Sequence, residues 1–472
     1  MTLPPGPKTP LWLLRQQLDN NPLGCLDAIY KRYGDIVTIM SGSRPIVYVS
    51  NPSAIKQYLT NTKEITISTV PPGDSPITVG QIGQQGILHI DGLVHKHRRP
   101  LLMKAYHGER MNATGKSICE ITEKIISQQA IAKTFIANEV LSKITLQVAI
   151  EVVIGLQEGE RYEKIKRLYS SCMKYEKSAL FEILKKLPFT QVDLGRLSPW
   201  GYHKYLLKEI FQFLYDEVKQ RRKQADPSRI DMLSDLIFAS DETGKPLSDE
   251  EVRDLLFLPI SASNNGATDS LTWLLYWVHY LTDVREQLLE ELDSLGKNPD
   301  PMKIVALPYL NAVCHETLRI YPSSMFSLAR VVVSPVELMG YELIPGTVLF
   351  TNIYSTHQRE DVYPEPKQFK PERFLEKKFS PYEFIPFGGG ARSCIAGSFS
   401  IFQMKLVLAT VLSNYKLELV NKRPERQKHS NDQCYAKSGV KMFMHGRRQK
   451  EAEEQREWGA GNKEDSPVSS RA

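Results

Sequence analysis

Two short runs of β-forming residues, Ile36–Met40 and Ile46–Val49, lie near the start of the chain. A break that contains glycine, serine and proline separates them, so they predict a β-hairpin. From about residue 110 to 300 the apolar positions recur with mostly helical spacing. Strand-type runs return at Ala329–Val333 and Val348–Ile353. The pattern predicts a mainly α protein with a small β-rich part.

One long apolar-periodic segment stands out in the middle of the chain. Ser248 and Glu251 have the spacing of a capping box, which marks the start of a helix. The periodicity continues toward Leu295. Pro259 and Gly266 interrupt it, and proline removes a helical N–H donor. We therefore predict a long but distorted helix.

The chain contains no linker and no internal repeat that would divide it. We expect a single domain over residues 1–446. Residues 447–472 are polar and mixed in charge, which is typical of a disordered tail. Six scattered cysteines in 472 residues are too few for a disulfide scaffold and favour a reducing compartment.

Composition and charge narrow the class of protein. Hydrophobic residues make up 42% and charged residues 24%, which excludes a wholly disordered chain, a collagen and a membrane bundle. The net charge of +6 is too diffuse to indicate nucleic-acid binding. No signal peptide is visible, and the best apolar stretch, Leu271–Leu281, is too short for a transmembrane anchor. These features favour a cytoplasmic protein and leave peripheral membrane contact open.

The sharpest chemical motif is a run of three glycines between Phe387 and Cys394. The glycines permit a tight turn, and residues 398–414 have helical periodicity. A cysteine between such a turn and a helix N-terminus is placed for stabilisation of its thiolate, which is a suitable axial ligand of haem iron. Arg392 is placed to pair with a haem propionate. The plainer interpretation is a glycine-rich loop with a buried cysteine.

A second pattern joins Glu316 to Arg319, three residues apart on a predicted helix. Most such pairs are surface salt bridges, but here apolar residues surround the pair. Arg373, in a Pro-Glu-Arg-Phe segment, supplies another guanidinium. A buried glutamate between two arginines would be an internally satisfied ionic cluster with a scaffolding role.

The order and spacing of these motifs resemble the cytochrome P450 superfamily of haem-thiolate oxygenases over about residues 5–445. The resemblance implies a triangular helical core enclosing haem b, a long distal helix and a cysteine-ligand loop. It makes Cys394 the iron ligand, and Glu316, Arg319 and Arg373 the structural triad. One departure is Ala396, where the family usually has glycine.

The resemblance also implies contacts to the haem propionates. His95 and Arg99 lie four residues apart, which places them on one face of a helix, and Arg330 follows in a Leu-Ala-Arg-Val segment. The plainer interpretation of His95 and Arg99 is surface charge within a basic run. With Arg392, Phe387 and Cys394, they complete the expected cofactor-binding set.

The distal helix departs from the family pattern. Monooxygenases of the family usually carry an acid and an alcohol that deliver protons to bound dioxygen. The matching positions here are Asn265 and Gly266, and neither residue relays a proton. Thr268 comes two residues after Gly266, which places its side chain about 200° further round a regular helix. A local bulge would bring Thr268 or Asp269 back toward the haem, so Asn264, Asn265 and Thr268 are the candidate catalytic residues.

Three functions follow from this departure. The first is a monooxygenase with an unusual proton relay. The second is an isomerase or dehydratase that rearranges a lipid peroxide without dioxygen or reductant, because the Asn264–Gly266 segment is similar to the distal helix of prostacyclin-synthase-type members. The third is a haem protein that binds ligands with little turnover. Tight binding without product would identify it.

The substrate and partners are expected from the resemblance to soluble microbial members that oxidise long-chain fatty acids and terpenes. The predicted pocket, which includes Leu88 and Phe326, is mostly apolar, so a lipophilic substrate is expected. No flavin or nicotinamide domain is evident, so electrons would come from an acidic ferredoxin or flavodoxin. Its docking site would involve basic residues near the cysteine, for which the candidates are Lys96, Arg98, Lys104 and Lys405. We expect the protein to be a monomer.

Overall fold

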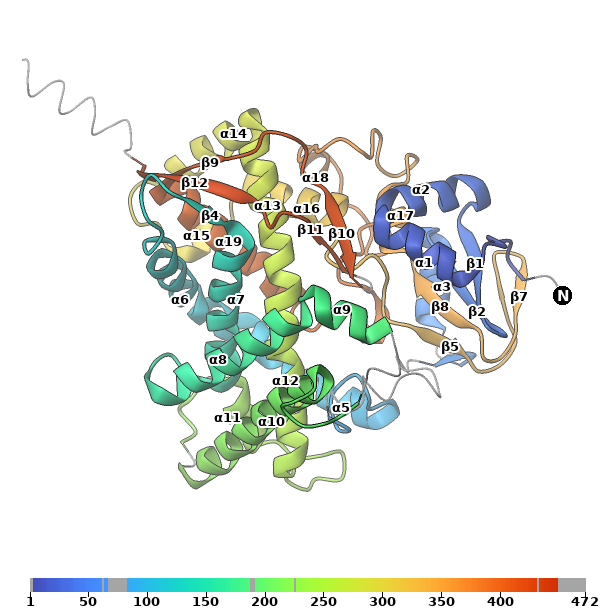
Figure 1. Cartoon of the computed structure of the whole chain (residues 1–472), viewed down its shortest axis with the longest axis horizontal. Coiled ribbons are helices and arrows are strands. Elements are labelled where there is room, and N and C mark those ends of the chain that lie inside the picture. Colours follow the sequence, from blue (N-terminus) through green and yellow to red (C-terminus); the bar gives the residue numbers. More distant parts are fainter. Residues whose placement is uncertain are drawn as a thin grey trace, which may run out of the picture.

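The computed structural model describes residues 3–61, 63–66, 83–186, 192–224, 226–430 and 433–448. Figure 1 shows helices grouped at one side of the molecule and the strand-rich part, with the N-terminal helices, at the other. Residues 67–82 and 449–472 lie outside the described residues, and the second range holds most of the predicted tail. The mainly α prediction is confirmed.

The helices follow the predicted periodic region and extend beyond it at both ends. Their bounds are α1 Leu11–Asn20, α2 Pro22–Tyr33, α3 Pro52–Thr60, α5 Gly92–Met103, α6 Gly108–Ile126, α7 Ala137–Ile154, α8 Gly159–Glu176, α9 Ala179–Lys186, α10 Pro199–Gln224, α11 Met232–Ile237, α12 Asp249–Ala262, α13 Thr268–Tyr280, α14 Thr282–Asp293, α15 Pro301–Val305, α16 Pro308–Ile320, α17 Ile353–His357, α18 Arg373–Glu376 and α19 Gly397–Asn414.

The strands are short. They are β1 Ile36–Ser41, β2 Arg44–Val49, β3 Ile65–Thr66, β4 Thr134–Ile136, β5 Arg330–Val332, β6 Val336–Leu338, β7 Tyr341–Leu343, β8 Val348–Thr351, β9 Tyr415–Leu419, β10 Gln427–Ser430, β11 Gln433–Ala436 and β12 Lys441–Arg447.

The largest sheet has the order β1-β2-β8-β5-β3. The predicted hairpin is present as antiparallel β1 and β2, and β2 also pairs in parallel with β8, with Ile46 opposite Val348. β5 pairs antiparallel with both β8 and β3. This sheet therefore joins the start of the chain to the segment that precedes the cysteine loop.

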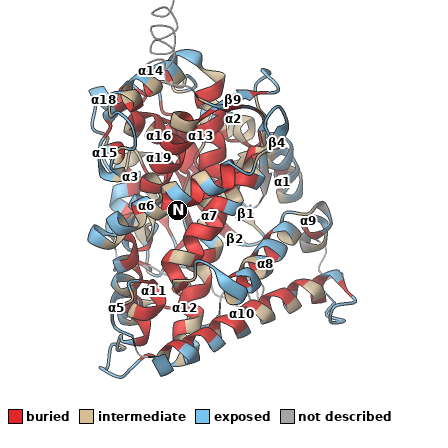
Figure 2. Ribbon diagram, turned by 90° about the vertical axis from the view of Figure 1, so that its left-hand side faces the viewer, coloured by how far each residue is buried: buried red, intermediate tan, exposed pale blue. Residues whose placement is uncertain are grey.

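The main hydrophobic core lies between the long helices. Helices α7 and α19 are buried around most of their circumference, and α13 crosses the centre of the molecule beside them. Figure 2 shows buried residues concentrated on these helices, whereas α10 is buried only along one side. A smaller core lies under the β1–β2 sheet. The two cores flank the cavity described below.

The predicted long helix is distorted, as its proline and glycine indicated. The capping box of Ser248 and Glu251 opens α12, a single π-helical turn covers Ser263–Ala267, and α13 follows. The helix does not continue to Leu295, because Leu281 takes an extended backbone and α14 begins at Thr282. The apolar periodicity continued across that break, so the spacing alone did not reveal it.

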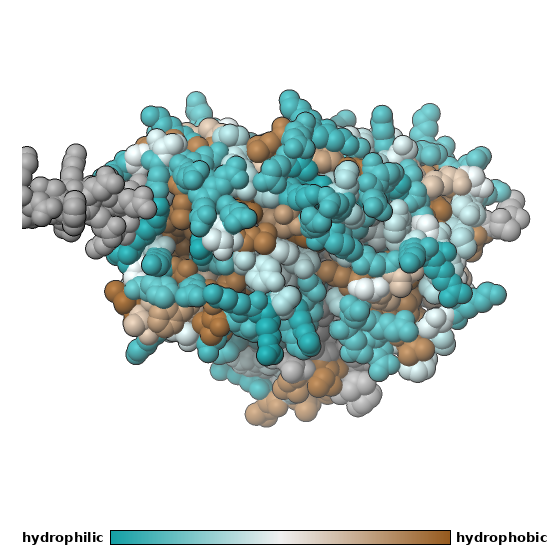
Figure 3. Space-filling model, turned by 90° about the horizontal axis from the view of Figure 1, so that it is seen from above, coloured by the Kyte–Doolittle hydropathy of each residue, from teal (hydrophilic) through white to brown (hydrophobic). Residues whose placement is uncertain are grey.

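At its C-terminal end the described chain stays folded slightly beyond the predicted boundary at 446. Arg447 ends β12, and the Arg448 guanidinium pairs with Asp293 at 2.5 Å. Among the described residues no helix is long and apolar enough to cross a membrane. The face seen in Figure 3 is mainly hydrophilic, with hydrophobic side chains in scattered groups.

Candidate functional site

A cavity of about 480 Å³ separates the distal helix from the cysteine loop. The α12–α13 helix with its π-turn forms one wall, and residues 386–396 form the wall opposite. α5 and the segment 323–330 close the sides. The cavity therefore brings together elements that lie some three hundred residues apart in the sequence.

The cysteine loop is held by its own backbone. The Cys394 N–H donates to the Phe387 carbonyl at 2.8 Å, which closes the loop just before α19 begins. Gly388 and Gly390 have φ of +65° and +67°, which other residues rarely adopt. At Gly389 a Cβ would lie 2.7 Å from a Leu59 side-chain carbon. The three glycines are thus required by conformation and by space.

The Cys394 thiol lines the cavity. Burial raises the pKa of this thiol, while the Ala396 N–H and the positive charge of Arg99 act in the opposite direction. Both opposing contributions stabilise the thiolate, and an N–H near a helix start and a neighbouring arginine are typical of reactive cysteines. Ala396 supplies this N–H from its backbone, so the alanine in place of glycine does not remove it.

Four basic side chains converge beside the thiol and line the same cavity: His95, Arg99, Arg330 and Arg392. Arg392 donates to the carbonyls of Ile87 and Ile90 at 2.7 and 2.6 Å, and Arg330 donates mainly to backbone carbonyls. Burial lowers the pKa of Arg392 to about 10. The three arginines thus concentrate positive charge in one part of the cavity lining, where their charges act on His95.

His95 is buried, and its Nε2 has no hydrogen-bond partner among the described residues. Burial, together with the charges of Arg392 and Arg99, lowers the pKa of His95 to about 4, so the imidazole is neutral at pH 7. A buried polar atom without a partner is rare, and it indicates a group that the polypeptide itself does not supply.

These observations test the fit of a haem group. Haem carries two carboxylates and an iron that accepts an axial thiolate. The cavity offers one thiol, a cluster of three arginines and an imidazole nitrogen that has no partner among the described residues. The residues present therefore fit the group, and the site is that of a haem-thiolate protein.

The structure brings the three predicted triad residues together behind the cysteine loop. Arg319 donates to both carboxylate oxygens of Glu316, at 2.6 and 2.8 Å, and Arg373 donates to Glu316 Oε1 at 3.1 Å. The Lys370 N–H gives a further bond at 2.7 Å. Glu316 and Arg319 are fully buried. The cluster is an internally satisfied ionic core.

Sequence reasoning missed His357, which links the triad to the cysteine loop. Its Nε2 accepts the Ile385 N–H at 2.9 Å, and its Nδ1 lies 3.2 Å from the Arg319 carbonyl. Burial and the Arg319 charge lower the pKa of His357 to about 3, so the ring stays neutral. The one available signal was its position shortly before the Pro-Glu-Arg-Phe segment.

On the distal side the π-turn separates the three candidate catalytic residues. Asn265 and Gly266 line the cavity, and the Asn265 Oδ1 is buried with no partner among the described residues. Asn264 and Thr268 are not part of the lining. The bulge does not bring Thr268 to the cavity, so the structure gives this hydroxyl no direct contact there.

Asn264 and Thr268 instead join the distal helix to α7 and α8. The Asn264 Oδ1 accepts from Ser142 at 2.8 Å and from Thr268 at 3.1 Å. Thr268 also bonds Thr145 at 2.7 Å, and the Asn264 Nδ2 donates to Met173 Sδ at 3.0 Å. Both side chains are buried, so this network holds the π-turn in place.

Asp269, the other residue that a bulge was expected to move, also lies outside the cavity lining. It is buried, and its Oδ1 accepts from Asn138 at 3.4 Å. Burial raises the pKa of Asp269 to about 6, against smaller opposing contributions from Lys177 and Asn138.

The cavity wall combines apolar and hydroxyl groups. Leu88 and Phe326, both expected in the substrate pocket, are part of it. Phe181 does not line the cavity, and its ring packs on Trp200 with centroids 5.8 Å apart. Serines are numerous around the cavity, at positions 261, 263, 270, 323, 324, 327, 393 and 400.

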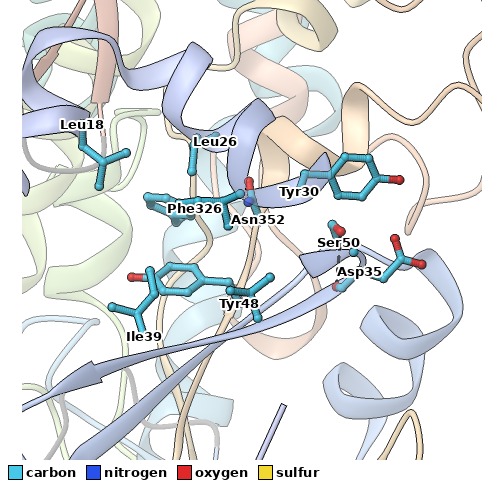
Figure 4. Close-up of a pocket in the computed structure, with 12 residues that line it drawn as sticks. Leu18, Leu26, Tyr30, Asp35, Ile39, Tyr48, Ser50, Phe326 and Asn352 are labelled. Carbon is cyan, nitrogen blue, oxygen red and sulfur yellow. Dashed lines mark hydrogen bonds between the residues drawn. The ribbon is translucent and has the colours of Figure 1, made fainter. Parts of the chain in front are cut away.

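A second, much smaller pocket of about 30 Å³ lies between α2 and the β1–β2 sheet. Figure 4 shows Tyr30, Tyr48 and Asn352 around it. A space of this size holds about one water molecule. Phe326 lines both this pocket and the large cavity and so separates them.

Two of the four basic residues predicted to meet an electron donor do not offer free charge. Arg98 is buried and pairs with Glu251 at 2.5 Å. Lys405 donates to the Val305 carbonyl at 2.8 Å, and burial lowers its pKa. Lys96 and Lys104 are exposed, although Lys104 also bonds Asp235 at 3.0 Å.

Comparison with known proteins identifies the family. The family model "Cytochrome P450" matches residues 4–440. Cytochrome P450 135B1 of Mycobacterium tuberculosis is 29% identical over 433 residues, which covers 91% of this chain and 88% of the relative. Cytochrome P450 138 of the same organism is 28% identical over 432 residues, covering 89% and 91%.

The fold is likewise similar to a solved structure described as "Retinoic acid bound cyanobacterial CYP120A1". The TM-score is 0.79 at 22% identity, with 94% of this chain and 100% of that chain covered. The chain belongs to the cytochrome P450 family. It is an oxidoreductase, a haem-thiolate monooxygenase that works with a redox partner and a small-molecule substrate.

Proposed function

We propose that the protein inserts one oxygen atom of dioxygen into a lipophilic substrate, such as a long-chain fatty acid, an alkane or a terpene. The observation that carries this proposal is the lining of the cavity that contains Cys394. Leu88, Leu258 and Phe326 give it apolar surface, while Asn265 offers one buried carbonyl oxygen with no partner among the described residues. Such a lining favours a lipophilic molecule oriented by few polar contacts.

In this proposal the cofactor is haem b. Cys394 would bind its iron, and His95, Arg99, Arg330 and Arg392 would hold its propionates. Phe387 packs against Gly397, where a Cβ would come within 3.2 Å of its ring, and so fixes the start of α19 beside the ligand. Haem iron bound to a thiolate supplies the activation of dioxygen.

Asn265 takes the place of the usual acid in this proposal. A carboxamide cannot release a proton at neutral pH, but its oxygen accepts a hydrogen bond from water. Gly266 leaves room beside it, because a Cβ there would meet only Ser323 Oγ, at 3.8 Å. We propose that Asn265 orders water in this space and that protons arrive through that water.

An acidic ferredoxin- or flavodoxin-type protein is the proposed electron donor. Lys96 and Lys104 are the exposed basic residues that remain from the predicted docking set. Charge complementarity mainly accelerates encounter, so the rate of reduction should fall as salt is raised.

Asn265 and Gly266 stand where the family usually carries the acid and the alcohol, and this supports a second candidate function. An isomerase that rearranges lipid hydroperoxides needs no proton delivery to dioxygen. There the Asn265 carboxamide would hydrogen-bond the peroxide. This candidate predicts fast turnover without reductant.

One experiment separates the candidates. Purified protein is given retinoic acid, fatty acids and terpenes with dioxygen, NADPH, ferredoxin and ferredoxin reductase, and products are identified by mass spectrometry. A parallel reaction contains a fatty-acid hydroperoxide and no reductant. Hydroxylated products that require reductant support the proposal, whereas rapid isomerisation of the hydroperoxide contradicts it.

Two controls complete this experiment. Cys394→Ala must lose the thiolate-ligated spectrum of the reduced carbon monoxide complex. Asn265→Ala should retain that spectrum but lose product. Tight substrate binding by the wild type without product in either reaction would indicate a binding protein.

A further inference from the structure

Three side chains that commonly bind metal ions meet where α8 and α10 lie together, outside the haem cavity. Cys172 and Glu176 are four residues apart in the last turns of α8, so they share one face of the helix. His203 lies in the second turn of α10. Figures 1 and 2 show the two helices packed beside each other.

The atoms of these residues that could bind a metal lie close together, around one carboxylate oxygen of Glu176. The His203 Nε2 lies 2.8 Å from Glu176 Oε1, and the Cys172 Sγ lies 3.7 Å from the same oxygen. All three donor atoms lie within 4.8 Å of one another. Ligands around a tetrahedral Zn²⁺ with bonds of roughly 2.0–2.3 Å are separated by about 3–4 Å. Small side-chain adjustments therefore suffice for coordination.

The surroundings hold the imidazole in this position. His203 is 1% exposed and packs against Phe181, Trp200 and Tyr175, with ring centroids 4.6, 6.0 and 6.3 Å away. The Cys172 side chain is buried as well. Glu176 is partly exposed, which leaves a path from solvent to the donor atoms. A rigid, half-closed set of ligands lowers the entropic cost of binding an ion.

We propose that Cys172, Glu176 and His203 form a binding site for a zinc ion. One thiolate, one imidazole and one carboxylate are the donors that Zn²⁺ accepts, and the fourth position stays open to water. Harder cations such as Mg²⁺ and Ca²⁺ prefer oxygen ligands, so sulfur and nitrogen donors disfavour them.

Zinc replaces the thiol proton when it binds. Burial and the neighbouring Glu176 raise the pKa of the Cys172 thiol, so the metal-free chain carries a neutral S–H. The proton leaves to solvent as the S–Zn bond forms, and no electron is transferred.

The ion would tie α8 to α10 next to the distal helix. Met173, the neighbour of Cys172, accepts the hydrogen bond from Asn264 in the π-turn. Zinc should therefore stabilise the folded holoenzyme, because it binds the folded arrangement and not the unfolded chain.

The test uses the haem-loaded full-length protein, in which Cys394 is occupied by iron. The protein is stripped with a chelator, supplied with Zn²⁺, desalted, and analysed for zinc by mass spectrometry. Retention of about one zinc ion per chain is expected. X-ray absorption at the zinc edge should find a single sulfur neighbour at about 2.3 Å and nitrogen or oxygen neighbours at about 2.0 Å. This second measurement needs no variant.

His203→Ala and Cys172→Ser should each weaken zinc binding by at least roughly 10- to 100-fold and abolish the zinc-dependent rise in melting temperature. Cys119→Ser, a half-buried free cysteine on α6, is the matched control and should leave binding unchanged. Zinc without a sulfur neighbour, zinc retained by His203→Ala, or no zinc in the wild type would overturn the site. In each of those cases Glu176 and His203 form only a hydrogen-bonded pair.

Discussion

The two faces of the cavity are built in opposite ways. Behind Cys394, the carboxylate of Glu316 receives two bonds from Arg319, one from Arg373 and one from the Lys370 backbone. Across the cavity, Asn265 presents an oxygen with no partner among the described residues, and Gly266 presents no side chain at all. The triad behind Cys394 is internally satisfied, whereas the distal side leaves polar groups free to bond molecules that enter and leave the cavity.

Because of this difference, we expect the residues behind Cys394 to determine the stability of the fold and the distal residues to determine turnover. Disturbing a satisfied buried cluster leaves uncompensated charge and should damage the fold. Changing an unpartnered group at a cavity wall should alter chemistry and leave the fold intact. Each of the following variants tests one side of this contrast.

The largest effect is expected for Glu316→Ala, which leaves two arginines buried without their carboxylate. Removing one partner of a buried ion pair costs about 3–5 kcal/mol, enough to cause loss of haem and of folded protein. Denaturant unfolding of the holoprotein measures it. Glu163→Ala is the matched control, because Glu163 pairs with Lys166 at the same three-residue spacing on an exposed surface. It should cost no more than about 0.5 kcal/mol, and equal losses in both variants would contradict the contrast.

A gain is expected from Asn265→Asp combined with Gly266→Thr, which introduces an acid and an alcohol at the cavity. The space around Gly266 admits a side chain, and its φ is not positive. Positioned proton-transfer groups contribute roughly 10²–10⁴-fold, so product formed per NADPH should rise by about tenfold or more. Gly266→Ala fills the same space without a hydroxyl and should give no gain. A double variant that matches this control would show that proton delivery does not limit turnover.

A pH effect is expected at Asp269, whose pKa burial raises from 3.8 to about 6. Because the folded state holds this proton more tightly than the unfolded chain, stability should fall as pH rises from about 4 to 6. Asp269→Asn should remove that slope and stabilise the protein above pH 6 by about 1–3 kcal/mol. Unfolding curves at several pH values measure this. The exposed Glu360→Gln should keep the wild-type slope, and an unchanged slope in Asp269→Asn would contradict the prediction.

The smallest effect on turnover is expected for Thr268→Val. Its hydroxyl bonds Thr145 and Asn264 and lies outside the cavity lining. Loss of these bonds should cost about 1–2 kcal/mol of stability, with turnover within about twofold of the wild type. Thr317→Val, a buried threonine on α16 that bonds the Val313 carbonyl, is the control for stability. A large loss of product in Thr268→Val alone would place this hydroxyl in the proton path.

The same contrast explains what the sequence allowed us to predict. Short contiguous motifs predict the cysteine side. They are a run of glycines at a turn that other residues rarely adopt, and a Glu–Arg pair on one helix face. Their partners could be inferred because the geometry is local. His357 escaped notice because its role depends on bonds to Arg319 and Ile385, which are distant in sequence.

The distal side was harder, because helical periodicity does not fix the direction of side chains across a π-turn. Proline and glycine indicated a distortion. Asn264 and Thr268, however, bond residues on α7 and α8, and no local sequence pattern predicts those contacts. The positions of Arg98 and Lys405 were misjudged for a similar reason. From the sequence alone, a basic residue resembles an exposed one until its partner in the fold is known, here Glu251 for Arg98 and the Val305 carbonyl for Lys405.

The parallel pairing of β2 with β8 also has a consequence for how the chain is made. β8 lies about 300 residues beyond β2, so at roughly 5–20 residues per second a ribosome needs about 15–60 s to supply it. During that interval the β1–β2 hairpin has an open edge, the kind of edge at which chains aggregate. The cysteine loop emerges later still. Newly made chains should therefore depend on chaperones early and on haem supply only at the end of synthesis.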